Sequence, residues 1–135
     1  MFKGKIRLYG RIFRIFAERG TGIELNAGCF PTDDSIMTIA IAKAILENDG
    51  KAEGLEDKTV EWMQKIGRQF PGCGYGGRFQ DWMFENNPQP YNSFGNGSAM
   101  RVSACGWAGK TLEDVRTLSR AVTIVTHNHP EGIKG

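Results

Sequence analysis

Residues 30–46 read FPTDDSIMTIAIAKAIL, a cluster of polar side chains followed by an apolar run. A hydroxyl, two adjacent carboxylates and a second hydroxyl come directly before a helix-forming run. Thr32 is placed as an N-cap, and Asp33 and Asp34 fall in the first turn, where negative charge suits the free N–H groups and the helix dipole. Apolar side chains occur on almost every side of the run, which predicts a helix over 33–46 that is buried all round. The two carboxylates are therefore expected at the inner end of a core helix.

Two interpretations of this helix start compete. In the first, the polar residues only cap the helix. In the second, Thr32, Asp33, Asp34 and Ser35 form part of a hard-cation site, because Mg²⁺ and Mn²⁺ take oxygen ligands from carboxylates, hydroxyls and water. Capping needs only one side-chain oxygen, whereas this segment supplies four oxygen-bearing side chains in succession. From this stretch alone, capping is nevertheless favoured.

Size and composition describe an ordinary soluble domain. The chain has 135 residues, of which 40% are hydrophobic and 24% charged, which suits one domain with a real core. No apolar run approaches the ~20 residues of a membrane span, and no secretory signal pattern follows the N-terminus. Three widely spaced cysteines (Cys29, Cys73 and Cys105) are expected to be reduced thiols. We therefore expect a cytoplasmic protein.

The net charge of +2 conceals a basic N-terminal segment. Residues 1–20 hold six basic side chains against the single acidic Glu18, whereas the remaining residues hold 11 basic and 14 acidic side chains. Apolar residues at helical spacing over 3–19 predict an amphipathic helix. Such a helix could contact a membrane surface or nucleic acid, but a surface helix packed on the core is favoured. No nucleic-acid or membrane partner is predicted.

Three further helices are expected. One follows Asp57 as a cap and carries Val60, Met63, Ile66 and Phe70 on one side. A short one covers 79–84. A third follows the capping signature that starts at Thr111, runs to about residue 126 and has an apolar side that includes Leu112. No strand-like alternation or hairpin dipeptide occurs, so the fold class is predicted as all-α.

Two further segments contain residues that could bind a ligand, but neither segment alone determines which ligand. Residues 91–101 read YNSFGNGSAMR, a small-residue loop that leads into a helix, where backbone N–H groups can approach a phosphate. The loop lacks the spacing of a P-loop or a dinucleotide fingerprint. Residues 126–131 read THNHPE. His127 and His129 are two positions apart and would not share a helix face, so hydrogen bonding is favoured over metal binding.

Taken together, three segments resemble the ADP-ribosylglycohydrolase family, whose enzymes remove ADP-ribose from arginine or serine side chains. Phe30–Ser35 resembles the family's Thr-Asp-Asp-Ser/Thr metal motif. Ser93–Arg101 resembles its ligand loop, and Thr126–Gly132 resembles its histidine segment. The resemblance covers residues 29–135, and residues 1–28 are expected to be a divergent basic N-terminal segment.

The resemblance implies a helical bundle around two Mg²⁺ or Mn²⁺ ions. Thr32, Asp33 and Asp34 would be metal ligands, with Asp33 and Asp34 catalytic. The reaction would cleave the N- or O-glycosidic bond at the anomeric carbon of ribose, through an oxocarbenium-like transition state. The residues expected to bind the substrate are Ser93, Gly95, Asn96, Gly97, Met100 and His127.

The chain also departs from the family pattern. The second metal motif of the family, Gly-x-Asp-x-Asp-Thr, is absent, and neither Glu18 nor Glu24 is assigned to the site. We therefore expect an incomplete, roughly half-length form, inactive alone and completed by a C-terminal half. The expected partner is ADP-ribose or an ADP-ribosylated protein. The alternatives are a non-catalytic ADP-ribose- or metal-binding remnant, or an interaction module built on the basic helix.

Overall fold

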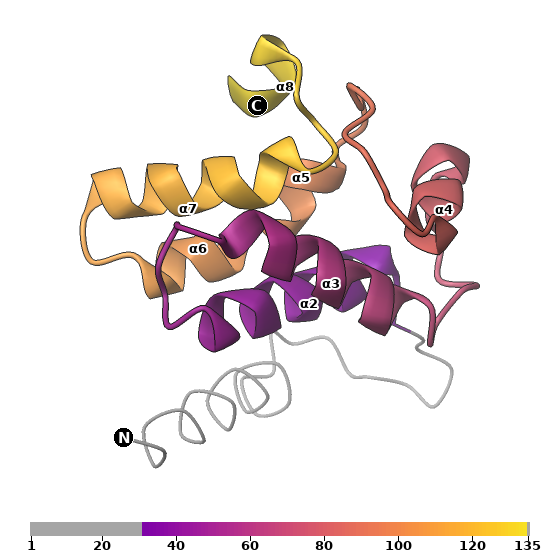
Figure 1. Cartoon of the computed structure of the whole chain (residues 1–135), viewed down its shortest axis with the longest axis horizontal. Helices are drawn as coiled ribbons and strands as arrows, with labels where there is room; N and C mark the ends of the chain where they lie inside the picture. The colour runs from indigo at the N-terminus through magenta and orange to yellow at the C-terminus, as the bar shows by residue number, and fades with distance from the viewer. Residues whose placement is uncertain (1–30, 135) are drawn as a thin grey trace, which may run out of the picture. The chain divides into compact units, whose positions relative to one another are not determined.

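The computed structural model describes residues 31–134, and every regular element in that range is a helix. The predicted all-α class is therefore confirmed, and no strand occurs among the described residues. The expected N-terminal helix over 3–19 and Cys29 lie outside them. The helices, shown in Figure 1, are α2 (Asp33–Glu47), α3 (Leu55–Gly67), α4 (Gly77–Phe84), α5 (Gly97–Arg101), α6 (Ser103–Ala108), α7 (Leu112–Ile124) and α8 (Pro130–Lys134).

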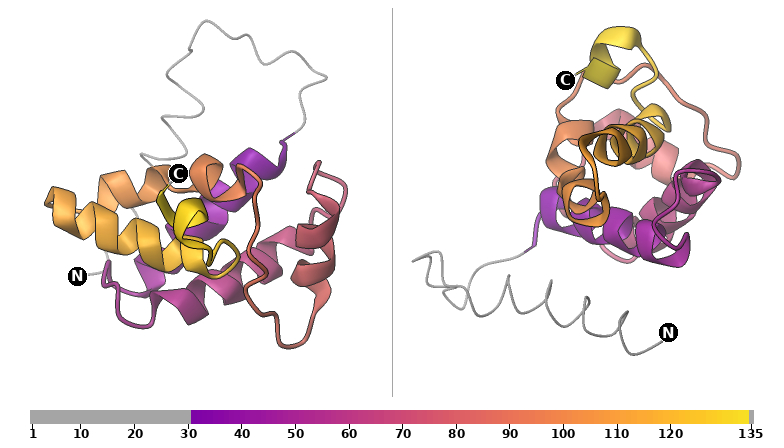
Figure 2. Two further views of the ribbon diagram at one scale, coloured as in Figure 1. Left: turned by 90° about the horizontal axis from the view of Figure 1, so that it is seen from above. Right: turned by 90° about the vertical axis from the view of Figure 1, so that its left-hand side faces the viewer.

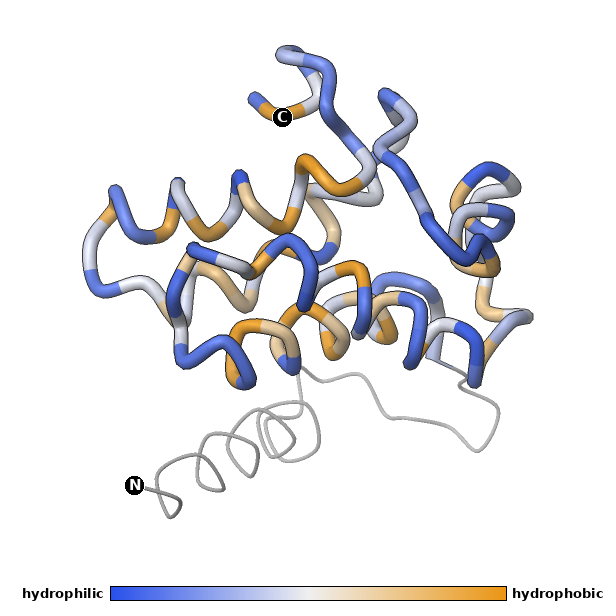
Figure 3. Tube along the Cα trace, in the orientation of Figure 1, coloured by the Kyte–Doolittle hydropathy of each residue, from blue (hydrophilic) through white to orange (hydrophobic). Residues whose placement is uncertain are grey.

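Four of these helices form a bundle. α2 contacts α3 and α6, and α7 contacts the same two helices, so the four close a ring of neighbours. Figure 2 shows α2, α3, α6 and α7 gathered in this way, with α4 to one side of α3. The hydropathy colours in Figure 3 place most of the apolar residues on these helices. The core therefore lies inside the ring.

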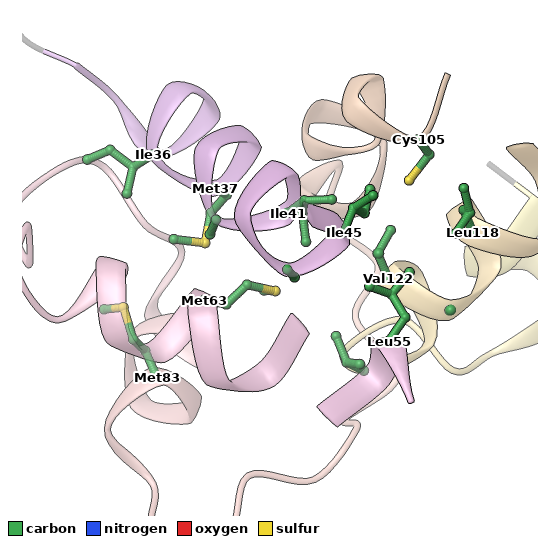
Figure 4. Packing of buried hydrophobic residues seen from close by; sticks show 14 of the residues in the cluster. Ile36, Met37, Ile41, Ile45, Leu55, Met63, Met83, Cys105, Leu118 and Val122 are labelled. Atoms are coloured by element: carbon green, nitrogen blue, oxygen red, sulfur yellow. The ribbon is translucent and has the colours of Figure 1, made fainter. Parts of the chain in front are cut away.

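The central helix matches its predicted bounds closely, but its burial differs. α2 begins at Asp33 and ends at Glu47. Met37, Ile41 and Ala44 are fully buried on one side of it, and Figure 4 shows Met37 and Ile41 near Met63 of α3. Ile39 is 41% exposed, so the prediction of a helix buried all round is wrong. An abundance of apolar residues does not by itself determine which sides of a helix are buried.

The second helix begins earlier than predicted. α3 starts at Leu55, with Gly54 as its N-cap at a φ of 75°, so Asp57 lies in the first turn and is not the cap. The helix ends at Gly67, and Phe70 lies beyond it, 43% exposed. Leu55 and Met63 pack into the core as buried residues. The spacing of apolar residues predicted the helix, but it indicated neither the N-cap at Gly54 nor the end at Gly67.

The capping signature at Thr111 is confirmed. The Asp114 amide donates to the Thr111 hydroxyl at 3.1 Å, and the Thr111 amide donates to the Asp114 carboxylate at 2.9 Å. α7 then runs from Leu112 to Ile124, two residues shorter than expected. Leu112 is 66% exposed, so its predicted place on the apolar side is wrong. No helix among the described residues has the length and apolarity that a membrane span requires.

Candidate functional site

The start of α2 differs from the buried metal motif that the sequence predicts. Thr32 occupies the N-cap position, but its hydroxyl makes no cap hydrogen bond and instead lies 3.4 Å from an Asp34 carboxylate oxygen, to which it donates. Thr32 and Asp34 are exposed, and Asp33 is half-buried. The expectation that both carboxylates sit deep in the core is therefore wrong. The start of α2 lies at the surface of the bundle, and of the two carboxylates only Asp33 is partly buried.

A glycine-rich loop, residues 71–77, holds the start of α2 in place. The Asp33 amide donates to the Cys73 carbonyl at 2.7 Å. Gly74 has a φ of 90°, a conformation that side-chain-bearing residues rarely adopt, and a Cβ there would lie 3.8 Å from an Asp33 carboxylate oxygen. Burial raises the pKa of Tyr75 to about 12, with the nearby Asp33 adding to the rise. This loop therefore forms one wall beside the Asp33 carboxylate.

The predicted ligand loop, Ser93–Gly97, is fixed mainly through its backbone. The Ser93 amide donates to the Thr126 carbonyl at 3.0 Å, and the Gly95 amide donates to the Ser93 hydroxyl at 3.3 Å. α5 then begins at Gly97. At its far end the Thr38 hydroxyl of α2 donates to the Met100 carbonyl at 3.2 Å. The loop is thus tied to the end of α7 and to the central helix.

His127 is buried beneath this loop and makes hydrogen bonds through both ring nitrogens. Its Nε2 lies 2.8 Å from the Gly95 carbonyl, and its Nδ1 lies 2.7 Å from the Thr126 hydroxyl. Burial lowers the pKa of His127, and the positive charge of Arg101 lowers it further, against the opposing hydrogen bond to Gly95. Its neighbour His129 is exposed. No group of three or more His, Cys, Asp or Glu side chains converges within residues 31–134, so the two histidines belong to no such metal cluster there.

Arg101 is a charged residue of the site to which sequence reasoning assigned no role. Its side chain is only 1% exposed, and burial lowers its pKa to about 10. One guanidinium nitrogen donates to the Val122 carbonyl at 3.0 Å and to the Thr126 hydroxyl at 2.8 Å. Its Nε has no hydrogen-bond partner among the described residues, and none of the ion pairs found there includes it. Only its place as the last residue of the segment Ser93–Arg101 signalled it.

These elements enclose a cavity of about 340 Å³. Its walls come from the start of α2, the beginning of α4, the segment 91–97, α5 and His127, which follows α7. Of the predicted site residues, the cavity brings together Asp33, Ser93, Gly95, Asn96, Gly97, Met100 and His127. Thr32 and Asp34 do not line it.

The cavity also contains residues that sequence reasoning missed. The Arg78 side chain donates to the Tyr91 carbonyl at 2.9 Å and lies over the Tyr91 ring at 4.7 Å. Phe94 stands at the cavity with 86% of its surface exposed. The charged side chains of the lining are the guanidinium groups of Arg78 and Arg101 and the single carboxylate of Asp33. The lining therefore favours an anionic ligand that also has a polar, carboxylate-facing end.

The donor set at the start of α2 fits a hard cation in chemistry but supplies few ligands. Thr32, Asp33 and Asp34 offer only oxygen donors, the type that Mg²⁺ and Mn²⁺ prefer. The hydrogen bond between Thr32 and Asp34 keeps two of these donors close together. Two carboxylates and one hydroxyl leave most positions of two octahedral ions to water or to other ligands.

Comparison with protein families gives a match over nearly the whole sequence. The family model described as ADP-ribosylglycohydrolase matches residues 3–135, so it also extends across the basic N-terminal segment. Neither a curated protein nor a solved structure gives a significant match to the chain. The predicted boundary after residue 28 stays a prediction. Because the family model spans nearly all of the sequence, and the described part is all-helical as the resemblance implied, the chain belongs to the ADP-ribosylglycohydrolase family.

Proposed function

We propose that the chain binds ADP-ribose in this cavity, and that it removes ADP-ribose from modified protein side chains once its metal site is complete. The family to which it belongs consists of ADP-ribosylglycohydrolase-type hydrolases. The single observation that carries the proposal is the convergence of distant residues. Asp33 lies at the start of α2, yet it lines the same cavity as Ser93–Gly97 and His127.

The cavity suits the diphosphate and ribose parts of ADP-ribose. Its volume of about 340 Å³ lies at the lower end of the range for small-molecule pockets. Gly95 and Gly97 let a ligand approach the backbone closely, and the absence of side chains there leaves room for phosphate oxygens. The guanidinium groups of Arg78 and Arg101 supply positive charge on the same lining. An anion would therefore offset the buried charge of Arg101, which has no acidic partner among the described residues.

The metal-dependent step depends on Asp33 and Asp34. When Mg²⁺ or Mn²⁺ is bound, it would polarise the ribose hydroxyls and an attacking water. Asp33 would hold the metal at the cavity wall, whereas Asp34 and Thr32 would contribute oxygen ligands from outside it. The negative charge of the two carboxylates would also favour positive charge that develops on the ribose ring. A complete two-ion site needs further oxygen ligands, and we propose that a complementing C-terminal half supplies them.

Activity and metal binding are tested separately. We expect negligible turnover of an ADP-ribosylated arginine or serine peptide by the chain alone with Mg²⁺, because even one missing electrostatic group typically costs ~10²–10³ in rate. Turnover should appear when a C-terminal half from a related enzyme is added. Robust turnover by the chain alone would contradict the account of an incomplete metal site.

In titration calorimetry, Asp34→Asn should abolish weak Mg²⁺ or Mn²⁺ binding, and equal binding by both proteins would leave Thr32-Asp33-Asp34 with no metal role.

The second candidate function is a non-catalytic ADP-ribose- or metal-binding remnant. Exposure of Thr32 and Asp34 outside the cavity favours this alternative, because catalytic metals need fixed and partly enclosed ligands. The two candidates differ in one outcome of the turnover experiment. If the C-terminal half restores no activity while ADP-ribose still binds, the remnant is the correct function.

A further inference from the structure

A continuous chain of hydrogen bonds connects the buried Arg101 to the ligand loop. It runs from the Arg101 guanidinium to the Thr126 hydroxyl at 2.8 Å and from that hydroxyl to Nδ1 of His127 at 2.7 Å. It then runs from Nε2 of His127 to the Gly95 carbonyl at 2.8 Å. Arg101, Thr126 and His127 are all buried, so water competes little for these bonds. The question is which way each hydrogen points.

The two ends of the chain fix every hydrogen between them. A guanidinium can only donate and a carbonyl can only accept. Nε2 of His127 must therefore carry a hydrogen for Gly95, which leaves Nδ1 of the neutral ring as an acceptor. The Thr126 hydroxyl accepts from Arg101 and is free to donate its own hydrogen to Nδ1. Each of the three hydrogen bonds then has one donor and one acceptor.

The other two states of His127 break this pattern. If only Nδ1 carried a hydrogen, the lone pair of Nε2 would face the Gly95 carbonyl oxygen at 2.8 Å. If both nitrogens were protonated, the Thr126 hydroxyl would receive two donors and lose the acceptor for its own hydrogen, close to the charge of Arg101. A buried polar group left without a partner is costly. The lowered pKa of His127 also favours the neutral ring.

Thr126 also holds the ligand loop from a second side. Its carbonyl accepts from the Ser93 amide at 3.0 Å, while its hydroxyl acts on Gly95 through His127. The two anchors bracket Phe94. Gly97 and Gly132 also lie close to His127, since an added Cβ would lie 3.6 Å from its Cε1 and 3.5 Å from its Cβ, respectively. Arg101 is the charged group whose field acts on the His127 ring.

We infer that Thr126 is a positioning residue, which fixes His127 as the tautomer with hydrogen on Nε2 and so holds Ser93–Gly97 in its binding shape. Arg101 sets the direction of the Thr126 hydroxyl. In this arrangement the Nε2 hydrogen of His127 is committed to Gly95 and is not offered to a ligand. His127 then supports ligand binding through the shape of the loop. The inference deepens the proposed function, because it names residues that shape the ADP-ribose cavity, but its first test needs no ligand.

The first test is long-range ¹H–¹⁵N NMR of the histidine rings in the full chain. The sequence has only two histidines, so His129→Gln leaves His127 as the single signal. At neutral pH we expect a neutral ring with hydrogen on Nε2. Thr126→Val removes the hydroxyl that donates to Nδ1 with little change in shape, so it should shift the ring toward a mixture of the neutral and the doubly protonated states, because Gly95 still accepts from Nε2. Thr126→Ser keeps the hydroxyl and should restore the wild-type pattern.

A wild-type ring with hydrogen on Nδ1, or a charged ring at neutral pH, would overturn the inference without any variant. So would a Thr126→Val spectrum identical to wild type. In ADP-ribose titrations, Thr126→Val should weaken affinity roughly tenfold, as expected for one lost buried hydrogen bond, and Thr126→Ser should stay within about twofold. If the wild-type chain shows the expected tautomer but binds no ADP-ribose, the proposed function fails and the hydrogen-bond chain stands.

Discussion

Gly67 at the end of α3 offers a sharp test of the packing, because two physical effects oppose each other there. Alanine favours a helix over glycine by ~1 kcal/mol, so Gly67→Ala should stabilise the protein if only the helix counts. The added Cβ, however, would overlap the sulfur of Met83 and lie 3.3 Å from the Met37 Cε. Met37 and Met83 are fully buried, so neither side chain can move into solvent.

The overlap is expected to decide the sign. Inserting a methyl group into a packed core typically costs ~1–3 kcal/mol, and the overlap with a buried but flexible methionine places the cost at about 2 kcal/mol, above the helix gain of ~1 kcal/mol. Gly67→Ala should therefore lower the free energy of unfolding by about 1 kcal/mol net of the helix gain, which is measured as a shift of the urea midpoint at constant slope. Gly106→Ala is the matched control, because a Cβ at Gly106 in α6 meets nothing within 4 Å, and it should be neutral or stabilising. A Gly67→Ala variant as stable as the control would refute the packing of Met83 against α3.

Three further predictions concern stability. Ile41→Asp should lower the free energy of unfolding in urea by about 3–5 kcal/mol, because it places an unpaired carboxyl in the core. Ile39→Asp on the exposed side of α2 should change it little. Similar losses for both variants would contradict the orientation of the helix. Thr111→Ala should cost ~1 kcal/mol by removing the cap of α7, and Thr111→Ser should restore most of it in the same assay. Because the pKa of His127 is lowered in the folded state, the unfolded chain takes up the proton first, so stability should fall as pH drops below about 6.5. His127→Gln should flatten that part of the stability–pH curve, and an unchanged slope would show that His127 is not the group responsible.

Much of the fold could be predicted from local patterns. The helix from Asp33 and the capping box at Thr111 depend on side chains within a few residues of each other, and both are present. Burial was harder to predict, because it depends on which neighbour packs on each side. Ile39 and Leu112 are apolar but exposed for that reason.

The candidate site divides in the same way. The segments that contain Ser93–Gly97 and His127 were identified from motifs, and both line the cavity. The depth of Asp34 was mispredicted, because a motif gives no information on where a helix start lies relative to the surface. Arg101 was given no role, since its importance comes from contacts with Val122 and Thr126, which lie more than 20 residues away and only the fold brings close.

The assignment of the cavity to ADP-ribose is tested most directly by ADP-ribose binding to Gly97→Val, measured by titration calorimetry with and without Mg²⁺. A Cβ at Gly97 would lie at an ordinary contact distance of 3.6 Å from Cε1 of His127, and the two methyl groups of valine are expected to take up space in the cavity that Gly97 lines. Gly106→Val is the matched control outside the cavity. We expect the wild type and the control to bind ADP-ribose, and Gly97→Val to bind it roughly tenfold more weakly or not at all. Equal binding by all three proteins, or no binding by the wild type, would contradict the assignment of this cavity to ADP-ribose.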